Sequence, residues 1–324
     1  MRIRLFALAL FIAAPLAAPL AAQEWRVFGR GAVFGAYVTE TGPAQPRNQF
    51  FSTNWFEGHA ERSFGKPSVD FHARVTAEPF TIPKERYPQL LQPNDRMRAH
   101  DLVEDAGVRF WWRALRVDAA LAAAPPLGAE PYRQRISSID FPQAPFSYDV
   151  AESFKSATHL AGLAIDTRPL LVEGAVFHAA QSTGRHTTLD NGPIDSWSGR
   201  VTLRPHDAVA LQLSHGKLGD AKRPVTSASA TWSGKSLAAT ALWTKRDQDT
   251  AYGAEAALRG RRHTVMARVE SIERRHVSLA YIFDLVKRVG IGIAGDYHPG
   301  THDIRTQYGH KPQSFYVFMR ARTE

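Results

Sequence analysis

The sequence predicts an all-β fold: a single antiparallel transmembrane β-barrel of about 16 strands, with short periplasmic turns and long extracellular loops. Three observations indicate this class. Apolar and polar residues alternate along most of the chain, the connections between the alternating runs differ in length by parity, and tryptophan gathers near the ends of the runs. A barrel of about 14 strands would also fit, because boundaries read from a pattern shift by several residues.

The alternation has a period of two residues and is clearest at 69–75, 115–121 and 277–283. Successive side chains of a β-strand point to opposite sides, so each run has one apolar and one polar face. Such a strand fits a wall between two unlike environments, which a transmembrane barrel provides. The strands expected on this basis are 25–39, 49–62, 67–78, 101–113, 114–124, 156–166, 170–180, 195–205, 208–217, 223–234, 236–246, 250–259, 262–273, 275–285, 288–299 and 312–321.

The connections distinguish this barrel from a soluble β-sandwich. On one side they are short, as at 63–66, 205–207 and 285–287, whereas on the other side they are mostly longer and include 78–100 and 125–155. Short turns on one rim and long loops on the other are typical of bacterial transmembrane barrels. We expect the two longest loops, which are rich in proline, either to fold into the bore as a constriction or to cover its mouth.

Tryptophan residues lie near both ends of the expected strands. Trp25, Trp112 and Trp232 fall beside short turns, and Trp197 and Trp243 fall near long loops. Because the indole ring is amphipathic, we expect two aromatic girdles where the barrel wall meets the two membrane–water interfaces.

Residues 1–22 have the character of a signal peptide. Arg2 and Arg4 precede an apolar run at 5–20, and the small residues before Gln23 form a cleavage site. The remaining residues, 23–324, contain no linker or internal repeat. We therefore expect one barrel domain that is exported to the outer membrane of a Gram-negative cell.

The composition excludes several classes of function. The chain has no cysteine, which excludes disulfides, thiol catalysis and thiolate metal sites. Its formal charge of +9 arises without any block of like charges, because arginine is scattered one or two residues at a time. This pattern indicates a solvated surface and a polar interior rather than a face that binds nucleic acid.

The polar faces of the strands supply the candidate lumen residues. A charge that faces lipid near the membrane midplane costs about 2–4 kcal/mol, so charged residues on these strands are expected to face inward. The candidates for lumen or constriction are Asp70, His72, Arg74, Arg109, Arg116, Asp118, Arg200, Arg204, Glu255, Arg259, Arg268 and Glu270. Arginine outnumbers the acids in this set, which favours anions if the interior is open.

Two interpretations of this interior remain open. A barrel of about 16 strands can enclose an aqueous channel, and the chain would then be a porin-like channel for the passive passage of small anionic solutes. Alternatively, cross-strand pairs of arginine and carboxylate fill the bore, and the chain is a structural or adhesive surface barrel.

Histidines near the last long loop suggest a possible metal site. His298, His302, Asp303 and His310 fall in one expected surface loop, and imidazole with carboxylate can bind zinc, copper or nickel. Their spacing matches no compact metal motif, however, and we expect no cofactor.

A lipid-modifying hydrolase is the third alternative, and the sequence gives it little support. Ser214 and His215 are adjacent and therefore point to opposite faces of their strand, as do His100 and Asp101. No Gly-x-Ser-x-Gly motif is present. We therefore expect no enzyme. The partners expected are outer-membrane lipid, the barrel assembly machinery and a small solute, without nucleic acid, and the oligomeric state is left open.

Several short motifs are similar to those of a known group of proteins. They are Asn54-Trp55, 78–83, 87–92, His100-Asp101-Leu102, 156–159 and 308–318. In these motifs the chain resembles a family of uncharacterised, porin-like proteobacterial outer-membrane β-barrel proteins. The resemblance implies the barrel fold and the outer-membrane location, and it implies no activity or catalytic residue. Such barrels commonly end on an aromatic residue that the assembly machinery reads, whereas this chain runs on from Phe318 to Glu324.

Overall fold

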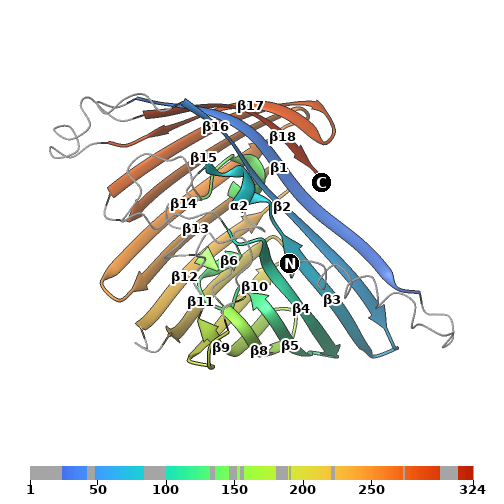
Figure 1. The fold of residues 1–324 in the computed structure, drawn as a ribbon. Helices are drawn as coiled ribbons and strands as arrows, with labels where there is room; N and C mark the ends of the chain where they lie inside the picture. Colours follow the sequence, from blue (N-terminus) through green and yellow to red (C-terminus); the bar gives the residue numbers. More distant parts are fainter. Residues whose placement is uncertain are drawn as a thin grey trace, which may run out of the picture.

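The computed structural model describes residues 24–41, 48–83, 100–131, 136–145, 152–153, 157–179, 189, 191–219, 223–272, 274–299 and 313–323. These residues form a closed antiparallel barrel of 16 strands (Figure 1). The predicted fold class and strand count are therefore confirmed. The expected signal peptide, 1–22, lies outside the described residues. Within the described part of the chain, no helix has the length and apolar character needed to cross a membrane.

Each barrel strand pairs with the next one along the chain, and β1 pairs with β18 to close the barrel. The barrel strands are β1 (Arg26–Thr41), β2 (Asn48–Ser63), β3 (Pro67–Val75), β4 (Val103–Trp112), β5 (Leu115–Ala123), β8 (Ala157–Asp166), β9 (Leu170–Ala179), β10 (Ser196–His206), β11 (Val209–Leu218), β12 (Arg223–Ser233), β13 (Leu237–Arg246), β14 (Asp249–Arg259), β15 (His263–Ile272), β16 (Arg274–Val286), β17 (Val289–Tyr297) and β18 (Gln313–Arg322). These bounds lie within a few residues of the predicted ones.

One rim of the barrel carries only short turns. The seven connections on this rim span two or three residues each: 64–66, 113–114, 167–169, 207–208, 234–236, 260–262 and 287–288. At Arg113 the turn needs a positive φ of 57°, a left-handed conformation that is uncommon for a residue other than glycine. The predicted short-turn rim is therefore present, and both ends of the barrel chain, at β1 and β18, lie on it.

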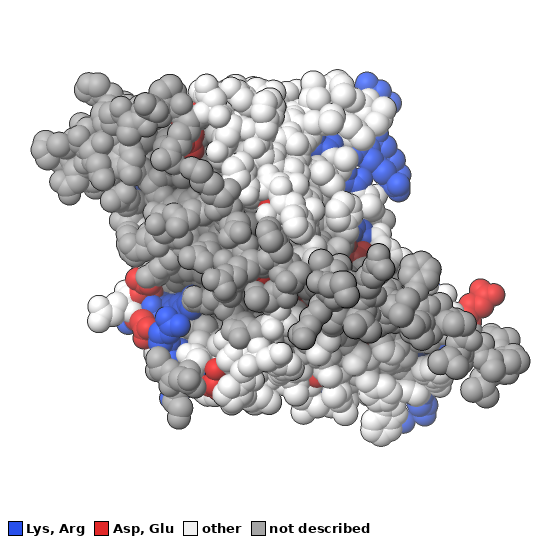
Figure 2. Space-filling view, in the orientation of Figure 1, with Lys and Arg blue, Asp and Glu red and all other residues white. Residues whose placement is uncertain are grey.

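The two faces of the wall differ as the alternation predicts. On β11, Leu213 is exposed on the outside while its neighbours Gln212 and Ser214 are buried inside. Large apolar side chains are exposed on every barrel strand, and Trp112, Trp197 and Trp232 are among them. Figure 2 shows broad uncharged areas of this outer surface, with lysine and arginine gathered at its margins.

The start of the β3–β4 connection covers an edge of β2. The strand β3 ends at Val75, three residues earlier than predicted, because a short helix, α2 (Glu78–Thr81), begins soon afterwards with a proline in its first turn. The Oδ1 atom of Asn54 accepts a hydrogen bond of 2.6 Å from the backbone N–H of Ala77. The hydroxyl of Thr81 donates to the carbonyl of Ser52 at 2.7 Å. The part of β2 that extends beyond β3 is thereby not left as an open sheet edge.

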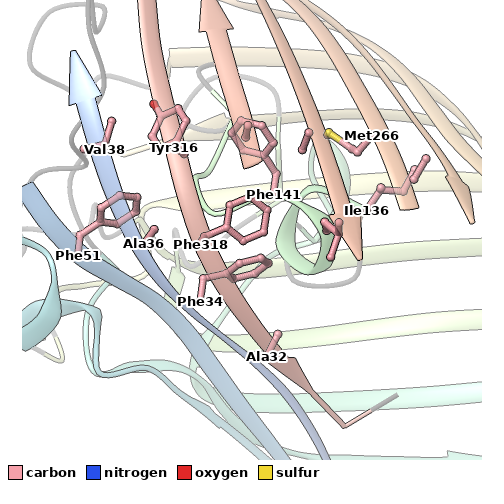
Figure 3. Close-up of a cluster of buried hydrophobic side chains, with 14 of the residues drawn as sticks. Ala32, Phe34, Ala36, Val38, Phe51, Ile136, Phe141, Met266, Tyr316 and Phe318 are labelled. Carbon is pink, nitrogen blue, oxygen red and sulfur yellow. The ribbon is translucent and has the colours of Figure 1, made fainter. Parts of the chain in front are cut away.

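The β5–β8 connection enters the barrel. It contains β6 (Ala129–Pro131), β7 (Glu152–Ser153) and the one-turn helix α3 (Ser137–Asp140). We call residues 136–145 the inserted segment. Its Phe141 is fully buried in the cluster of inward side chains drawn in Figure 3, next to Tyr316 and Phe318. Of the two placements expected for this loop, its described residues 136–145 take the one inside the bore.

Polar contacts hold the inserted segment in place. The indole N–H of Trp55 donates to the carbonyl of Ser138 at 3.3 Å, and the hydroxyl of Thr53 donates to the carbonyl of Pro142 at 2.9 Å. The guanidinium of Arg268 lies 4.5 Å from the centre of the Phe141 ring, a cation–π distance. These contacts come from β2 and β15, so the segment packs on the part of the wall that contains β1, β2 and β14 to β18.

Candidate functional site

A cavity of about 260 Å³ lies inside the barrel on another part of the wall, along β3 to β5 and β8 to β11. Its charged lining consists of His72, Arg74, Asp105, Arg109, Arg116, Asp118, Glu173, Arg200 and Arg204. Its apolar lining includes Ala120, Ala123, Ala124, Pro126, Leu160 and Leu171. Five arginines and three carboxylates thus line the cavity, and three of the arginines also pair with a carboxylate just outside this lining: Arg74 with Glu57, Arg109 with Asp70 and Arg204 with Asp166.

The strand register places opposite charges side by side on β3, β4 and β5. Asp70 is paired with Arg109, and Arg109 is paired with Asp118. The Nη1 atom of Arg109 lies 3.9 Å from Asp70, and its Nε atom lies 3.6 Å from Asp118. These ion pairs are longer than hydrogen bonds, and 30% of the Arg109 side chain is exposed to the interior. Arg109 is therefore held loosely.

The same alternation continues across β5, β9 and β10 with shorter contacts. The Nε atom of Arg116 lies 2.9 Å from Asp118, and its Nη2 atom lies 2.9 Å from Glu173. The Nε atom of Arg200 donates to the other oxygen of Glu173 at 2.7 Å. We call Asp70, Arg109, Asp118, Arg116, Glu173 and Arg200 the charge ladder.

Small residues on β8 allow the ladder to cross that strand. Ala164 stands between Arg116 and Glu173 in the strand register, and Gly162 is paired with Asp118. A Cβ atom added at Gly162 would lie 3.4 Å from the Cβ atom of Asp118. Because neither residue fills the space in front of β8, the long side chain of Arg116 reaches a carboxylate two strands away.

A second set of charged groups extends the wall from β3 to β2 and β4. His59 lies 3.2 Å from Glu57 through Nε2 and 3.1 Å from Asp70 through Nδ1. His72 lies 3.3 Å from Asp105 through Nε2. The interior wall thus carries ionisable groups from β2 to β10, with acids placed between basic or imidazole groups throughout.

The predicted interior residues fall into two groups. Eight of them, Asp70, His72, Arg74, Arg109, Arg116, Asp118, Arg200 and Arg204, lie in the ladder or line the cavity. The other four, Glu255, Arg259, Arg268 and Glu270, lie on the wall that holds the inserted segment. Arg259 lies 2.6 Å from Asp140 of that segment, and Arg268 lies 3.0 Å from Glu270. The structure thus brings eight of the twelve predicted lumen residues together around the cavity and places the other four beside the inserted segment.

Sequence reasoning missed several of the charged groups. Glu57, Asp105 and Glu173 each pair with a predicted arginine or histidine, and Asp140 pairs with Arg320. Glu173 had a usable signal, because it is a single charge within the otherwise apolar stretch 170–177. Asp140 had none, because its partner lies 180 residues away.

The histidines of the proposed metal site are only partly described. His298 is buried and stacks on His276 with 4.7 Å between ring centres, so it does not lie in an open surface loop as expected. His302, Asp303 and His310 lie outside the described residues. Among the described residues, no group of three or more histidines and acids is placed to hold a metal ion. Metal binding by these four residues stays a prediction.

The residue pairs considered for hydrolysis are engaged elsewhere. The hydroxyl of Ser214 accepts a hydrogen bond of 2.9 Å from the backbone of Gly128, whereas the ring of His215 contacts the hydroxyl of Thr226 at 2.8 Å on the outer face. His100 contacts Glu78 at 2.6 Å. Neither arrangement orients a base toward a serine.

Comparison with known proteins identifies the type of fold. The chain is similar to the OmpF porin of Salmonella typhi, solved in complex with daunomycin, with a TM-score of 0.61 and 10% identity over 91% of this chain and 97% of that one. An anion-selective porin from Comamonas acidovorans matches with a TM-score of 0.58 and 15% identity over 92% and 100% of the two chains. A mutant of the Rh. blastica porin matches with a TM-score of 0.57 and 9% identity over the same shares.

These similarities show that the chain has the barrel fold of bacterial porins. No protein-family model matches the sequence, and no curated protein matches it. The family resemblance suggested by the short motifs therefore stays a prediction, and the function has to be argued from the interior of the barrel.

Proposed function

We propose that the chain is an outer-membrane, porin-like channel for the passive passage of small anionic solutes. The observation that carries this proposal is the interior cavity whose lining has five arginines and three carboxylates. A permeating anion inside this cavity meets more guanidinium than carboxylate groups in the lining itself, which lowers its energy relative to a cation. A barrel of about 16 strands is wide enough to enclose an aqueous path.

The outer surface supports the membrane location in this proposal. Its exposed side chains are large and apolar, as at Leu163, Leu213 and Val317. In water such a continuous apolar surface would associate, whereas lipid accommodates it. Export by a signal peptide at 1–22 and insertion by the barrel assembly machinery belong to the same proposal. We propose no enzymatic activity.

The inserted segment determines which part of the interior a solute would use. It occupies the side next to β1, β2 and β14 to β18, while the cavity lies along β3 to β5 and β8 to β11. A solute that crosses the barrel would therefore move along the charge ladder, in contact with Arg109 and Arg116. The segment narrows the path, so we expect passage of small solutes only.

Conductance across planar bilayers tests the channel. Protein refolded in detergent is expected to give single-channel events, and its zero-current potential in a potassium chloride gradient is expected to show a preference for chloride. Arg109→Gln removes one charge from the path. At about 5 Å in water a unit charge contributes roughly 0.8 kcal/mol, so the local chloride concentration should fall by up to about fourfold.

The matched control is Arg261→Gln, which removes an exposed arginine from a short turn. It is expected to shift the zero-current potential less than Arg109→Gln does. Absence of channel events from protein that migrates as a folded barrel on an unheated gel would contradict the proposal. That result would favour the second candidate, a structural or adhesive barrel, for which the filling of part of the bore by the inserted segment is the supporting observation.

A further inference from the structure

The charge ladder ends on an arginine that has an unpaired donor atom. From Asp70 to Glu173 each basic group lies between two carboxylates, but beyond Arg200 the next strand, β11, places the neutral Ser214 at the paired position. The Nη1 atom of Arg200 is buried and has no hydrogen-bond partner among the described residues. Only 11% of the Arg200 side chain is exposed. Arg200, which lines the cavity, therefore has a carboxylate partner on one side of the ladder only.

A planar guanidinium suits a carboxylate as a further partner. Arginine presents its N–H groups as a rigid fork that matches two carboxylate oxygens, and charge-assisted hydrogen bonds of this kind are strong. A buried charged donor without an acceptor is unfavourable, so an anion that reaches Nη1 removes an existing cost.

The same cavity has an apolar side. Ala123 and Leu160 line it, together with Pro126 at the start of the β5–β8 connection. Ala123 and Leu160 also belong to a buried apolar cluster with Leu127 and Phe177, so this side is a packed surface. The volume of about 260 Å³ is below the roughly 300 Å³ at which pockets for drug-sized ligands begin, and it therefore suits a small molecule.

We infer that this cavity is a binding subsite for small organic monocarboxylates with an apolar body. The carboxylate pairs with the guanidinium of Arg200, and the body lies against the apolar side formed by Ala123, Pro126 and Leu160. The subsite rests on the proposed channel function and names the class of solute that would be retained on its way through. Inorganic phosphate shares the negative charge but lacks the apolar body, so it is expected to bind more weakly.

Inhibition of chloride current tests the subsite in reconstituted full-length protein. Benzoate and butyrate are expected to reduce the chloride conductance saturably, whereas acetate and inorganic phosphate need higher concentrations. Arg200→Gln is expected to raise the half-saturating benzoate concentration at least tenfold. Leu160→Ser is expected to weaken benzoate while leaving acetate unchanged. Arg261→Gln, on the exposed turn, serves as the control, and heat-modifiable migration shows that each variant has folded.

The outcomes separate the subsite from the channel. If chloride flows with anion preference but benzoate inhibits equally in wild type and Arg200→Gln, the subsite is wrong and the channel stands. If phosphate binds as tightly as benzoate, the wall is a plain anion site and the inference is also overturned. If no channel forms, the proposed function fails, and calorimetric titration of the folded protein with benzoate decides the subsite: saturable heat that Arg200→Gln removes supports it, and no heat refutes it.

Discussion

Replacing Asp140 by asparagine is expected to release the inserted segment from the wall without opening the barrel. The carboxylate of Asp140 is fully buried and lies among three arginines of the strands. The nearest contacts are to Arg320 and, at 2.6 Å, to Arg259, and Arg322 lies 3.7 Å away. The amide of asparagine keeps the shape of the side chain but removes the charge that these three guanidinium groups share.

The loss of docking free energy depends on how much negative charge and solvent remain next to the three arginines. Removing one partner of a buried ion pair costs about 3–5 kcal/mol, because the other charge is left without compensation. Arg320 keeps Asp284 at 2.6 Å, and the side chains of Arg259 and Arg322 remain 25% and 17% exposed. We therefore expect Asp140→Asn to weaken the docking of the segment by the lower end of this range, about 3 kcal/mol. This shifts the ratio of docked to released segment on the order of a hundredfold.

Limited trypsin digestion measures the released population. Arg133 and Arg135 stand directly before the inserted segment and are trypsin targets. Where closing is faster than cleavage, the cleavage rate follows the population of the open form. Asp140→Asn is expected to be cut much faster than wild type in this stretch and to show larger, noisier single-channel currents. The gel mobility of the barrel should not change, because the strand ladder is untouched.

The matched control is Asp284→Asn, which also takes a carboxylate from Arg320 but has no described contact with the inserted segment. It is expected to leave the trypsin cleavage rate near that of wild type. If Asp140→Asn is cut no faster than Asp284→Asn, the ion pairs do not anchor the segment, and the reasoning from buried charge is refuted.

Two further predictions concern the two faces of the wall. Glu173→Gln removes the carboxylate that Arg116 and Arg200 share. The zero-current potential in a potassium chloride gradient should therefore indicate a stronger preference for chloride. An unchanged potential would show that these arginines do not face the permeation path. Leu213→Arg places a charge on the outer face and should lower the free energy of unfolding in lipid vesicles by about 2–4 kcal/mol, measured with urea. The inward neighbour Gln212→Arg should cost less, and equal costs would mean that the outer face does not meet lipid.

The strands could be predicted because alternation is a local property. In 69–75 the side chains of Asp70, His72 and Arg74 share one face whatever the neighbouring strands do, and the structure places all three inside. The partners of these side chains could not be predicted in the same way. Asp70 meets Arg109, and Arg109 meets Asp118, only through the register of three strands, and register depends on pairing across the whole barrel.

The inserted segment could not be placed from the sequence for a related reason. The helices α2 and α3 each have four residues, which is too short for a periodic apolar pattern to be visible. The sequence left open whether the β5–β8 connection enters the bore, because the answer depends on Asp140 and Phe141 meeting side chains of β14, β15 and β18, more than 100 residues further along the chain.

The position of Asp140 also bears on the sign of the interior charge. A carboxylate of a connection that enters a barrel can face the arginines of either wall. Here Asp140 pairs with Arg259 and Arg320 on the wall opposite the charge ladder, so it does not neutralise Arg109 or Arg116. The balance of charge along the cavity thus depends on where the inserted segment is anchored as well as on how many arginines the strands carry. Loss of that anchor would change the width of the path and its charge together, which is why Asp140→Asn should alter conductance and selectivity in the same measurement.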